Sequence, residues 1–267
     1  MSPENFPKSE DWLPLLEWGM ELLINPSPAR ILEGFEAWNY RNKLRPQLRQ
    51  LERGKLLERR GSRENPTVHL TPRGRLGALG GVDPEQRWQR AWDDKWRLLV
   101  FDLPIRSQAP RIRLWRWLRA HRFGLLQRSV WISPDRLSRS DLPLQQVKGT
   151  PGDFSVIEGR PTLPESDVDL VTSAWDFDEI NRRYQTVLDF AAKGLELGST
   201  AETEPLKLRQ WLAHERIAWL AALDLDPLLP EALLPKGYLG REAFEQRRKV
   251  YQNFTRFNRT TRPVNGG

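Results

Sequence analysis

The chain contains no cysteine and no long apolar run. Without cysteine there is no disulfide bond, and every zinc or iron–sulfur site built on cysteine ligands is excluded. No apolar stretch approaches the ~20 residues that a membrane-spanning helix needs, so we expect no membrane partner. The polar, acidic beginning MSPENFPKSEDW lacks the pattern of a signal peptide. These absences favour a cytoplasmic protein.

The sequence also lacks the short motifs of common catalytic and cofactor sites. It shows no serine–histidine–aspartate order, glycine-rich phosphate loop or paired-carboxylate motif. His214 and Glu215 are adjacent, but neighbouring helix residues do not face each other and cannot act on one atom without a third group. We expect His214 to be partly buried with a local hydrogen bond. We therefore predict a protein that is not an enzyme and holds no cofactor.

Positive charge and tryptophan are abundant. The 267 residues carry a formal net charge of +7 and twelve tryptophans, most of which should pack in the cores of two or three small domains. Segment 41–75 alone has eleven Lys or Arg and three Glu, a local net charge of +8 that accounts for the whole excess. Such a concentration is typical of a surface that binds a polyanion.

Three helices are predicted in the N-terminal part of the chain, and the third lies in the basic segment. They are expected over 11–24, 28–38 and 41–53, and the third buries a face of leucines. Gly54 should end the third helix. Because proline has no N–H, Pro46 fits only in a first turn, so this helix either begins near Lys43 or is kinked.

Two short strands, 56–60 and 67–71, follow, and the turn-rich tip GSRENP between them carries Arg63. Pro72 and Gly74 are expected to end the unit. Three helices and a basic hairpin form the plan of a winged helix-turn-helix, whose third helix enters the major groove while the hairpin touches phosphate or minor groove. The runs LRQLERGKL and LTPRG also resemble those of many bacterial winged-helix regulators.

The winged-helix interpretation assigns DNA contacts to polar and basic residues of the third helix and the hairpin. They are Arg41, Lys43, Arg45, Gln47, Arg49, Arg60, Arg63 and Arg73. Arginine pairs with guanine or with phosphate, and the sequence leaves both roles open. The alternative is a solvated helix face that binds nothing specific.

The centre of the chain predicts a small α+β domain. Its elements follow the β-α-β-β-α-β order of a ferredoxin-like fold, with a polar stretch around 138–147 before the last strand. The strands and the first helix are expected at 95–102, 111–121, 123–127, 129–133 and 153–158.

The remainder predicts a helical domain. Its helices are expected at 166–174, 177–192, 206–223 and 241–257. Between them, 194–205 should be a polar linker, and the proline-rich 226–240 an ordered but irregular crossing. The apolar stripe of 206–223 suits a partner helix or a dimer seam.

Three phrases stand in order after the predicted winged helix: WDDKWRLLVFDLP, WLRAHRFGLLQRSVWISP and DPLLPEALLPKGYLG. Together they resemble the PaaX family, bacterial repressors of phenylacetic acid catabolism and their relatives. The resemblance implies an α+β multidomain chain with a winged helix (1–80), a ferredoxin-like centre (92–162) and a C-terminal helical dimerisation domain (165–260). In the best-known members an aryl-coenzyme A thioester releases the repressor from its operator.

The centre also resembles the small nuclease-like subunit of CRISPR spacer-integration complexes, in which an aspartate at the end of the first strand is the candidate metal ligand. The matching residue is Asp102. One carboxylate is a poor magnesium site, although a dimer could present two copies. Asp93 and Asp94 lie at the other end of the strand and are not expected to join it. Alternatively, Asp102 caps the turn before Pro104 through local backbone amides.

A second basic surface is predicted on the helix 111–122, which carries arginine at 111, 113, 116, 119 and 122. These side chains could contact DNA that flanks an operator. They could instead be solvated, or pair with the acidic segments 165–169 and 176–179, and the sequence favours these readings.

We therefore predict a sequence-specific DNA-binding transcriptional regulator. It would act as a homodimeric repressor on double-stranded DNA, released by a small-molecule effector such as an acyl-coenzyme A. The first alternative is a metal-dependent nuclease that uses Asp102. The second is a nucleic-acid-binding scaffold without sequence preference.

Overall fold

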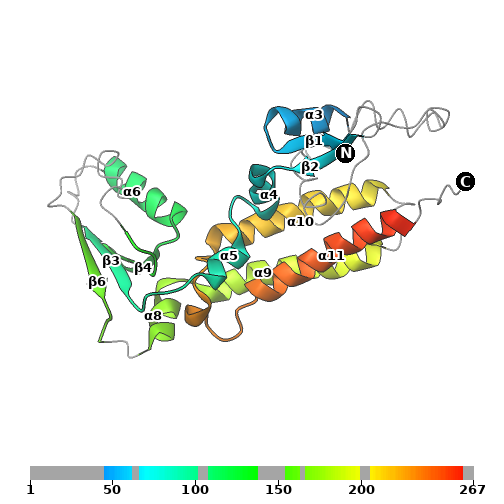
Figure 1. Cartoon of the computed structure of the whole chain (residues 1–267). Helices are drawn as coiled ribbons and strands as arrows, with labels where there is room; N and C mark the ends of the chain where they lie inside the picture. The colour runs from blue at the N-terminus through cyan, green and yellow to red at the C-terminus, as the bar shows by residue number, and fades with distance from the viewer. Residues whose placement is uncertain are drawn as a thin grey trace, which may run out of the picture. The chain divides into compact units, whose positions relative to one another are not determined.

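The computed structural model describes residues 45–61, 66–101, 108–137, 154–162, 166–198 and 205–260. Within these ranges the chain has an α+β fold with two small antiparallel sheets (Figure 1). The helices are α3 (Arg45–Arg53), α4 (Pro72–Leu79), α5 (Pro84–Gln89), α6 (Gln108–Ala120), α8 (Asp167–Ala174), α9 (Phe177–Gly198), α10 (Pro205–Leu225) and α11 (Gly240–Thr260), with a 3₁₀ turn η7 (Glu231–Leu233). The strands are β1 (Leu57–Gly61), β2 (Pro66–Leu70), β3 (Trp96–Phe101), β4 (Gly124–Gln127), β5 (Val130–Ser133) and β6 (Phe154–Gly159).

The chain divides into two compact units. The central unit comprises 84–183 and 221–239, and the helical unit comprises 1–83, 184–220 and 240–267. Helix α9 therefore begins in the central unit and ends in the helical unit. None of the described helices is long and apolar enough to span a membrane.

The central unit is built on a four-stranded sheet in the order β4-β5-β3-β6, and all neighbouring strands are antiparallel. This is the strand order of a ferredoxin-like fold, and it confirms the predicted strands to within two residues. The polar stretch around 138–147 lies outside the described residues.

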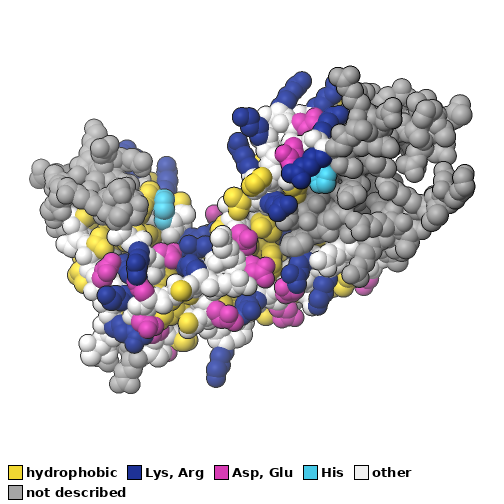
Figure 2. All heavy atoms as spheres, viewed as in Figure 1, with side chains coloured by type: hydrophobic (Ala, Val, Ile, Leu, Met, Phe, Trp, Pro, Cys, Tyr) yellow, Lys and Arg dark blue, Asp and Glu magenta, His cyan; other side chains and the backbone are white. Residues whose placement is uncertain are grey.

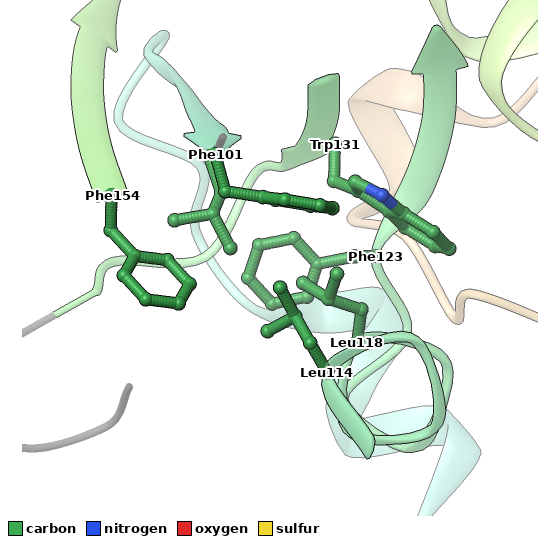
Figure 3. Packing of buried hydrophobic residues seen from close by; sticks show 7 residues of the cluster. Phe101, Leu114, Leu118, Phe123, Trp131 and Phe154 are labelled. Atoms are coloured by element: carbon green, nitrogen blue, oxygen red, sulfur yellow. The ribbon is translucent and has the colours of Figure 1, made fainter. Parts of the chain in front are cut away.

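Helix α6 covers one face of this sheet. Leu114 and Leu118, four residues apart, lie on one side of the helix and point into a core of aromatic side chains (Figure 3). The strands and the loop after α6 contribute Leu99, Phe101, Phe123, Trp131 and Phe154 to this core. The alternation of buried residues along β3 places Leu99 and Phe101 on the same face.

The crossing before α11 is irregular, as predicted, and hydrogen bonds hold it. The fully buried carboxylate of Asp226 accepts the N–H of Leu228 at 2.7 Å and the hydroxyl of Tyr238. The Tyr238 oxygen in turn accepts the indole N–H of Trp88 at 3.1 Å, which attaches the crossing to α5. The segment is ordered because each of these buried polar groups has a hydrogen-bond partner.

In the helical unit, α10 packs its apolar stripe against other helices of the same chain. Trp219 contacts Tyr184 of α9 and Phe244 of α11, and Trp211 contacts Tyr251 of α11. The indole N–H of Trp211 donates to the carbonyl of Phe190 at 2.8 Å. The structure therefore supports the partner-helix interpretation of this stripe.

The predicted linker at 194–205 is wrong at its beginning, because α9 continues to Gly198. A Cβ at Gly194 would lie 2.5 Å from the ring of Trp211 and 2.7 Å from Val250. Glycine is needed there for α9 to approach α10 and α11 closely. Tertiary packing thus outweighs the low helix propensity of glycine.

Candidate nucleic-acid interface

Helix α3 presents a continuous polar face to solvent. Leu48 and Leu51 are 1% and 2% exposed and hold the helix against the rest of its unit. Arg49, Gln50 and Arg53 are all exposed. Their spacing of one and four residues places them on the side opposite the leucines.

Helix α3 ends at Arg53, as predicted, but Gly54 is not its left-handed residue. The left-handed residue that ends the helix is Lys55, with φ of 56°, and not Gly54. The amide of Leu56 donates to the carbonyl of Leu51, and the amide of Lys55 to that of Glu52, which are the two bonds of a Schellman motif. Pro46 lies in the first turn, where its missing N–H is tolerated. The motif turns the chain sharply into β1 and leaves the Lys55 side chain exposed.

The hairpin pairs β1 with β2 and is tied to α3. The guanidinium of Arg59 on β1 forms a two-pronged ion pair with Glu52 on α3, and its second bond is 3.1 Å long. Arg60 pairs with Glu58 on the same strand, and its side chain remains 66% exposed. The hairpin tip with Arg63 lies outside the described residues.

The LTPRG run closes this arrangement after the end of β2 and begins helix α4, which was not predicted from the sequence. Thr71 caps the new helix α4: its hydroxyl accepts the amide of Gly74 at 3.0 Å and donates to the carbonyl of Lys55 at 2.7 Å. A Cβ on Gly74 would lie 2.0 Å from the carbonyl oxygen of Leu56. The motif therefore holds the base of the hairpin against α4, and only glycine fits at its last position.

Three of the eight residues predicted to contact DNA have described side chains, and all three are exposed. Arg49, Arg60 and Arg73 are exposed, on α3, β1 and the first turn of α4. Arg45 and Gln47 lie on α3, but their side chains are outside the described residues, as are Arg41, Lys43 and Arg63. The DNA-binding role of all eight stays a prediction.

The structure adds basic residues that the prediction omitted. Arg53, Lys55 and Arg59 are exposed around the same helix end. Arg53 follows Arg49 by four residues, so helical periodicity was a sufficient signal for it. Figure 2 shows Lys and Arg side chains gathered over α3 and the hairpin, with few acidic side chains among them. No described residue forms an ion pair with Arg49, Arg53 or Lys55.

The described residues offer no cluster of ligands for the metal site predicted at Asp102. Asp102 lies outside them, and they contain no group of three or more carboxylate, histidine or cysteine side chains that could hold a metal ion. Asp93 is held by Arg97 at 2.5 Å and Arg136 at 3.0 Å, and the hydrogen bond from Arg97 is the main reason its pKa is lowered. A carboxylate shared by two guanidinium groups is a structural partner of those side chains.

The adjacent His214 and Glu215 do not form a site. His214 is exposed, which corrects the predicted partial burial. Glu215 is instead the buried residue, and it pairs with Arg247 at 2.6 Å and accepts the hydroxyl of Tyr251. The two neighbours point in different directions, as consecutive helix residues must.

Comparison with known families identifies the parts of the chain. Residues 89–171 match the PaaX protein central Cas2-like domain, and residues 175–260 match the PaaX-like protein C-terminal domain. A chain that carries both domains in this order belongs to the PaaX family. No curated protein matches it.

A solved structure has a similar fold. The uncharacterized protein Rv0674 from Mycobacterium tuberculosis superposes with a TM-score of 0.53 and 19% sequence identity. The match covers 96% of this chain and 92% of that one, so the likeness extends beyond the two family domains. At this identity it concerns the fold alone.

Proposed function

We propose that this protein is a sequence-specific DNA-binding transcriptional regulator whose reading element is α3. The observation that carries the proposal is the exposed face of Arg49, Gln50 and Arg53 beside Lys55, with no acidic partner among the described residues for its three cations. Membership in the PaaX family supports a regulatory role. In this proposal the N-terminal region is a winged helix, with α3 in the major groove and the β1–β2 hairpin as the wing.

The local geometry suits such a role. The Schellman turn and the Arg59–Glu52 pair fix the hairpin relative to α3, so both elements meet a duplex as one rigid body. Arginine side chains that project from a helix pair with guanine edges or with phosphates. An interface held by several phosphate contacts weakens steeply with salt, because each contact releases counterions.

The proposal extends to assembly and control. We propose a homodimeric repressor with domains at 1–80, 92–162 and 165–260, and an acyl-coenzyme A thioester as the first effector class to test. The resemblance of the three sequence phrases to the family supports this extension.

The test compares the protein's own upstream intergenic DNA with a scrambled duplex of equal length by fluorescence anisotropy. Wild type should prefer its own DNA, and Arg49→Gln with Arg53→Gln should weaken that binding about tenfold or more, since a good arginine–base pair is worth about 1–3 kcal/mol. Arg182→Gln with Arg183→Gln is the matched control, because both arginines are exposed and paired with Glu179. Equal binding by the α3 variant and the control would contradict the proposal.

Adding Mg²⁺ to the same titration tests the nuclease alternative. A regulator leaves the duplex intact in Mg²⁺ and Mn²⁺. Metal-dependent cleavage that disappears in Asp102→Asn would replace the regulator proposal with the nuclease. Equal affinity for both duplexes would favour the scaffold without sequence preference.

A further inference from the structure

A second basic surface lies on α6, in the central unit. This helix has four arginines and no acidic residue. Arg113, Arg116 and Arg119 are exposed, and their spacing of three residues places them on one side. Leu114 and Leu118, on the other side, point into the core (Figure 3). We call Arg113, Arg116 and Arg119 the α6 arginine row.

The arginine row differs from three arginines on the long helices α9 and α11. On α9, Glu179 binds both Arg182 and Arg183 at 2.7 Å, and on α11 Glu245 binds Arg248 at 2.6 Å. No described residue forms an ion pair or hydrogen bond with any member of the arginine row. The usual pairing of an arginine with an acid one turn away is therefore absent from α6.

Three acids of the segments that the sequence offered as partners bind other residues. Asp167 accepts the indole N–H of Trp96 at 2.7 Å, and Asp169 accepts the hydroxyl of Ser166 at 2.8 Å. Glu179 is held by the two arginines of its own helix. Intramolecular pairing with these residues therefore does not account for the arginine row.

Stability does not explain the arginine row either. Like charges one turn apart repel each other and destabilise a helix. Each of the three exposed guanidinium groups can clamp a phosphate with two parallel hydrogen bonds. A row of guanidinium groups with no described acidic partner is best suited to bind a regular row of phosphates.

We propose that the α6 arginine row binds the phosphate backbone of double-stranded DNA as a second contact surface of this chain. The inference rests on the proposed function for its partner, but it concerns a different unit and a different contact. Phosphate contacts carry no sequence information, so the arginine row contributes equally to binding on any sequence. Arginines of α3 that touch bases contribute more on the chain's own DNA than on a scrambled duplex.

The experiment measures full-length protein on both duplexes by anisotropy, from about 50 to about 200 mM salt. The test variant is Arg113→Gln, Arg116→Gln and Arg119→Gln. The control variant is Arg182→Gln, Arg183→Gln and Arg248→Gln. It also removes three positive charges, but from arginines that have acidic partners. Glutamine keeps the helix propensity close to that of arginine, so both variants should fold.

The test variant should lose about tenfold or more in affinity for both duplexes, and its slope of log affinity against log salt should fall by about 2–3, at ~0.9 for each lost phosphate contact. Its ratio of affinities for own and scrambled DNA should stay that of wild type. The control should change the slope by less than about 0.5. If the triple variant does not fold, Arg116→Gln alone should lower the slope by about 0.9.

Each failure has its own signature. If wild type binds DNA and the α3 variant is impaired, but the α6 variant equals the control, the arginine row is a solvated surface and this inference is overturned. If wild type binds neither duplex, the proposed function and this inference fall together. If the α6 variant loses preference for its own DNA, the arginine row reads bases and the phosphate role is wrong.

Discussion

Glu215 and Arg247 form a charged pair in the interior of the helical unit, where each side chain is 1% exposed. The guanidinium donates to both carboxylate oxygens, at 2.6 and 3.3 Å. It also lies over the rings of Trp219 and Tyr251, 4.9 and 4.8 Å from their centroids. Such a pair is tolerated only while both partners are present, because either charge alone would be buried without compensation.

We predict that Glu215→Gln lowers the free energy of unfolding by about 3–5 kcal/mol, the usual cost of breaking a buried ion pair from one side. Urea denaturation followed by circular dichroism measures it. His214→Gln is the control, and at an exposed position it should change stability by less than about 0.5 kcal/mol. Adding Arg247→Met to Glu215→Gln should restore most of the loss. Unchanged stability in the single variant would show that Glu215 is not held as described.

At the scale of elements, the sequence predicts what depends on neighbouring residues. The strands of the central sheet were predictable because β-branched and aromatic runs are separated by turns, and their edges agree with the structure to within two residues. The continuation of α9 past Gly194 was not predictable, because it depends on Trp211, which lies on another helix. The same limit applies to Glu52, whose pairing with Arg59 requires the hairpin to fold back onto α3.

The end of α3 shows what the sequence leaves open even locally. Gly54 and Lys55 are adjacent, and glycine is the usual left-handed residue of a helix end. The structure instead gives the left-handed conformation to Lys55. For a residue with a Cβ this conformation costs roughly 1–2 kcal/mol.

We predict that Lys55→Gly is more stable than Lys55→Ala by about 1 kcal/mol, since glycine removes the backbone strain but has more conformational freedom in the unfolded chain. The two variants lose the same charge, so their difference isolates the backbone effect. Chemical denaturation measures it. Equal stability of the two variants would mean that the helix does not end at Lys55 through a left-handed residue.

At the scale of the whole molecule, basic surfaces occur in both compact units. The helical unit carries Arg49, Arg53 and Lys55 around the end of α3, and the central unit carries the α6 arginine row. The first surface was largely predictable from charge density and helical period. That no described residue pairs with the α6 arginine row was not predictable, because Asp167, Asp169 and Glu179 bind other residues of the folded chain.

The proposed regulator should act as a two-fold symmetric dimer, because a repressor with one reading helix per chain doubles its contacts on a symmetric operator. Light scattering after gel filtration should therefore give twice the 31.2 kDa of one chain. Footprinting on the upstream DNA should show two protected half-sites about 10–10.5 base pairs apart, or a multiple of that spacing. The variant Arg49→Gln with Arg53→Gln should remain a dimer while its footprint weakens. A mass of one chain with and without DNA, or a single protected half-site, would contradict the dimer and require each chain to bind its operator alone.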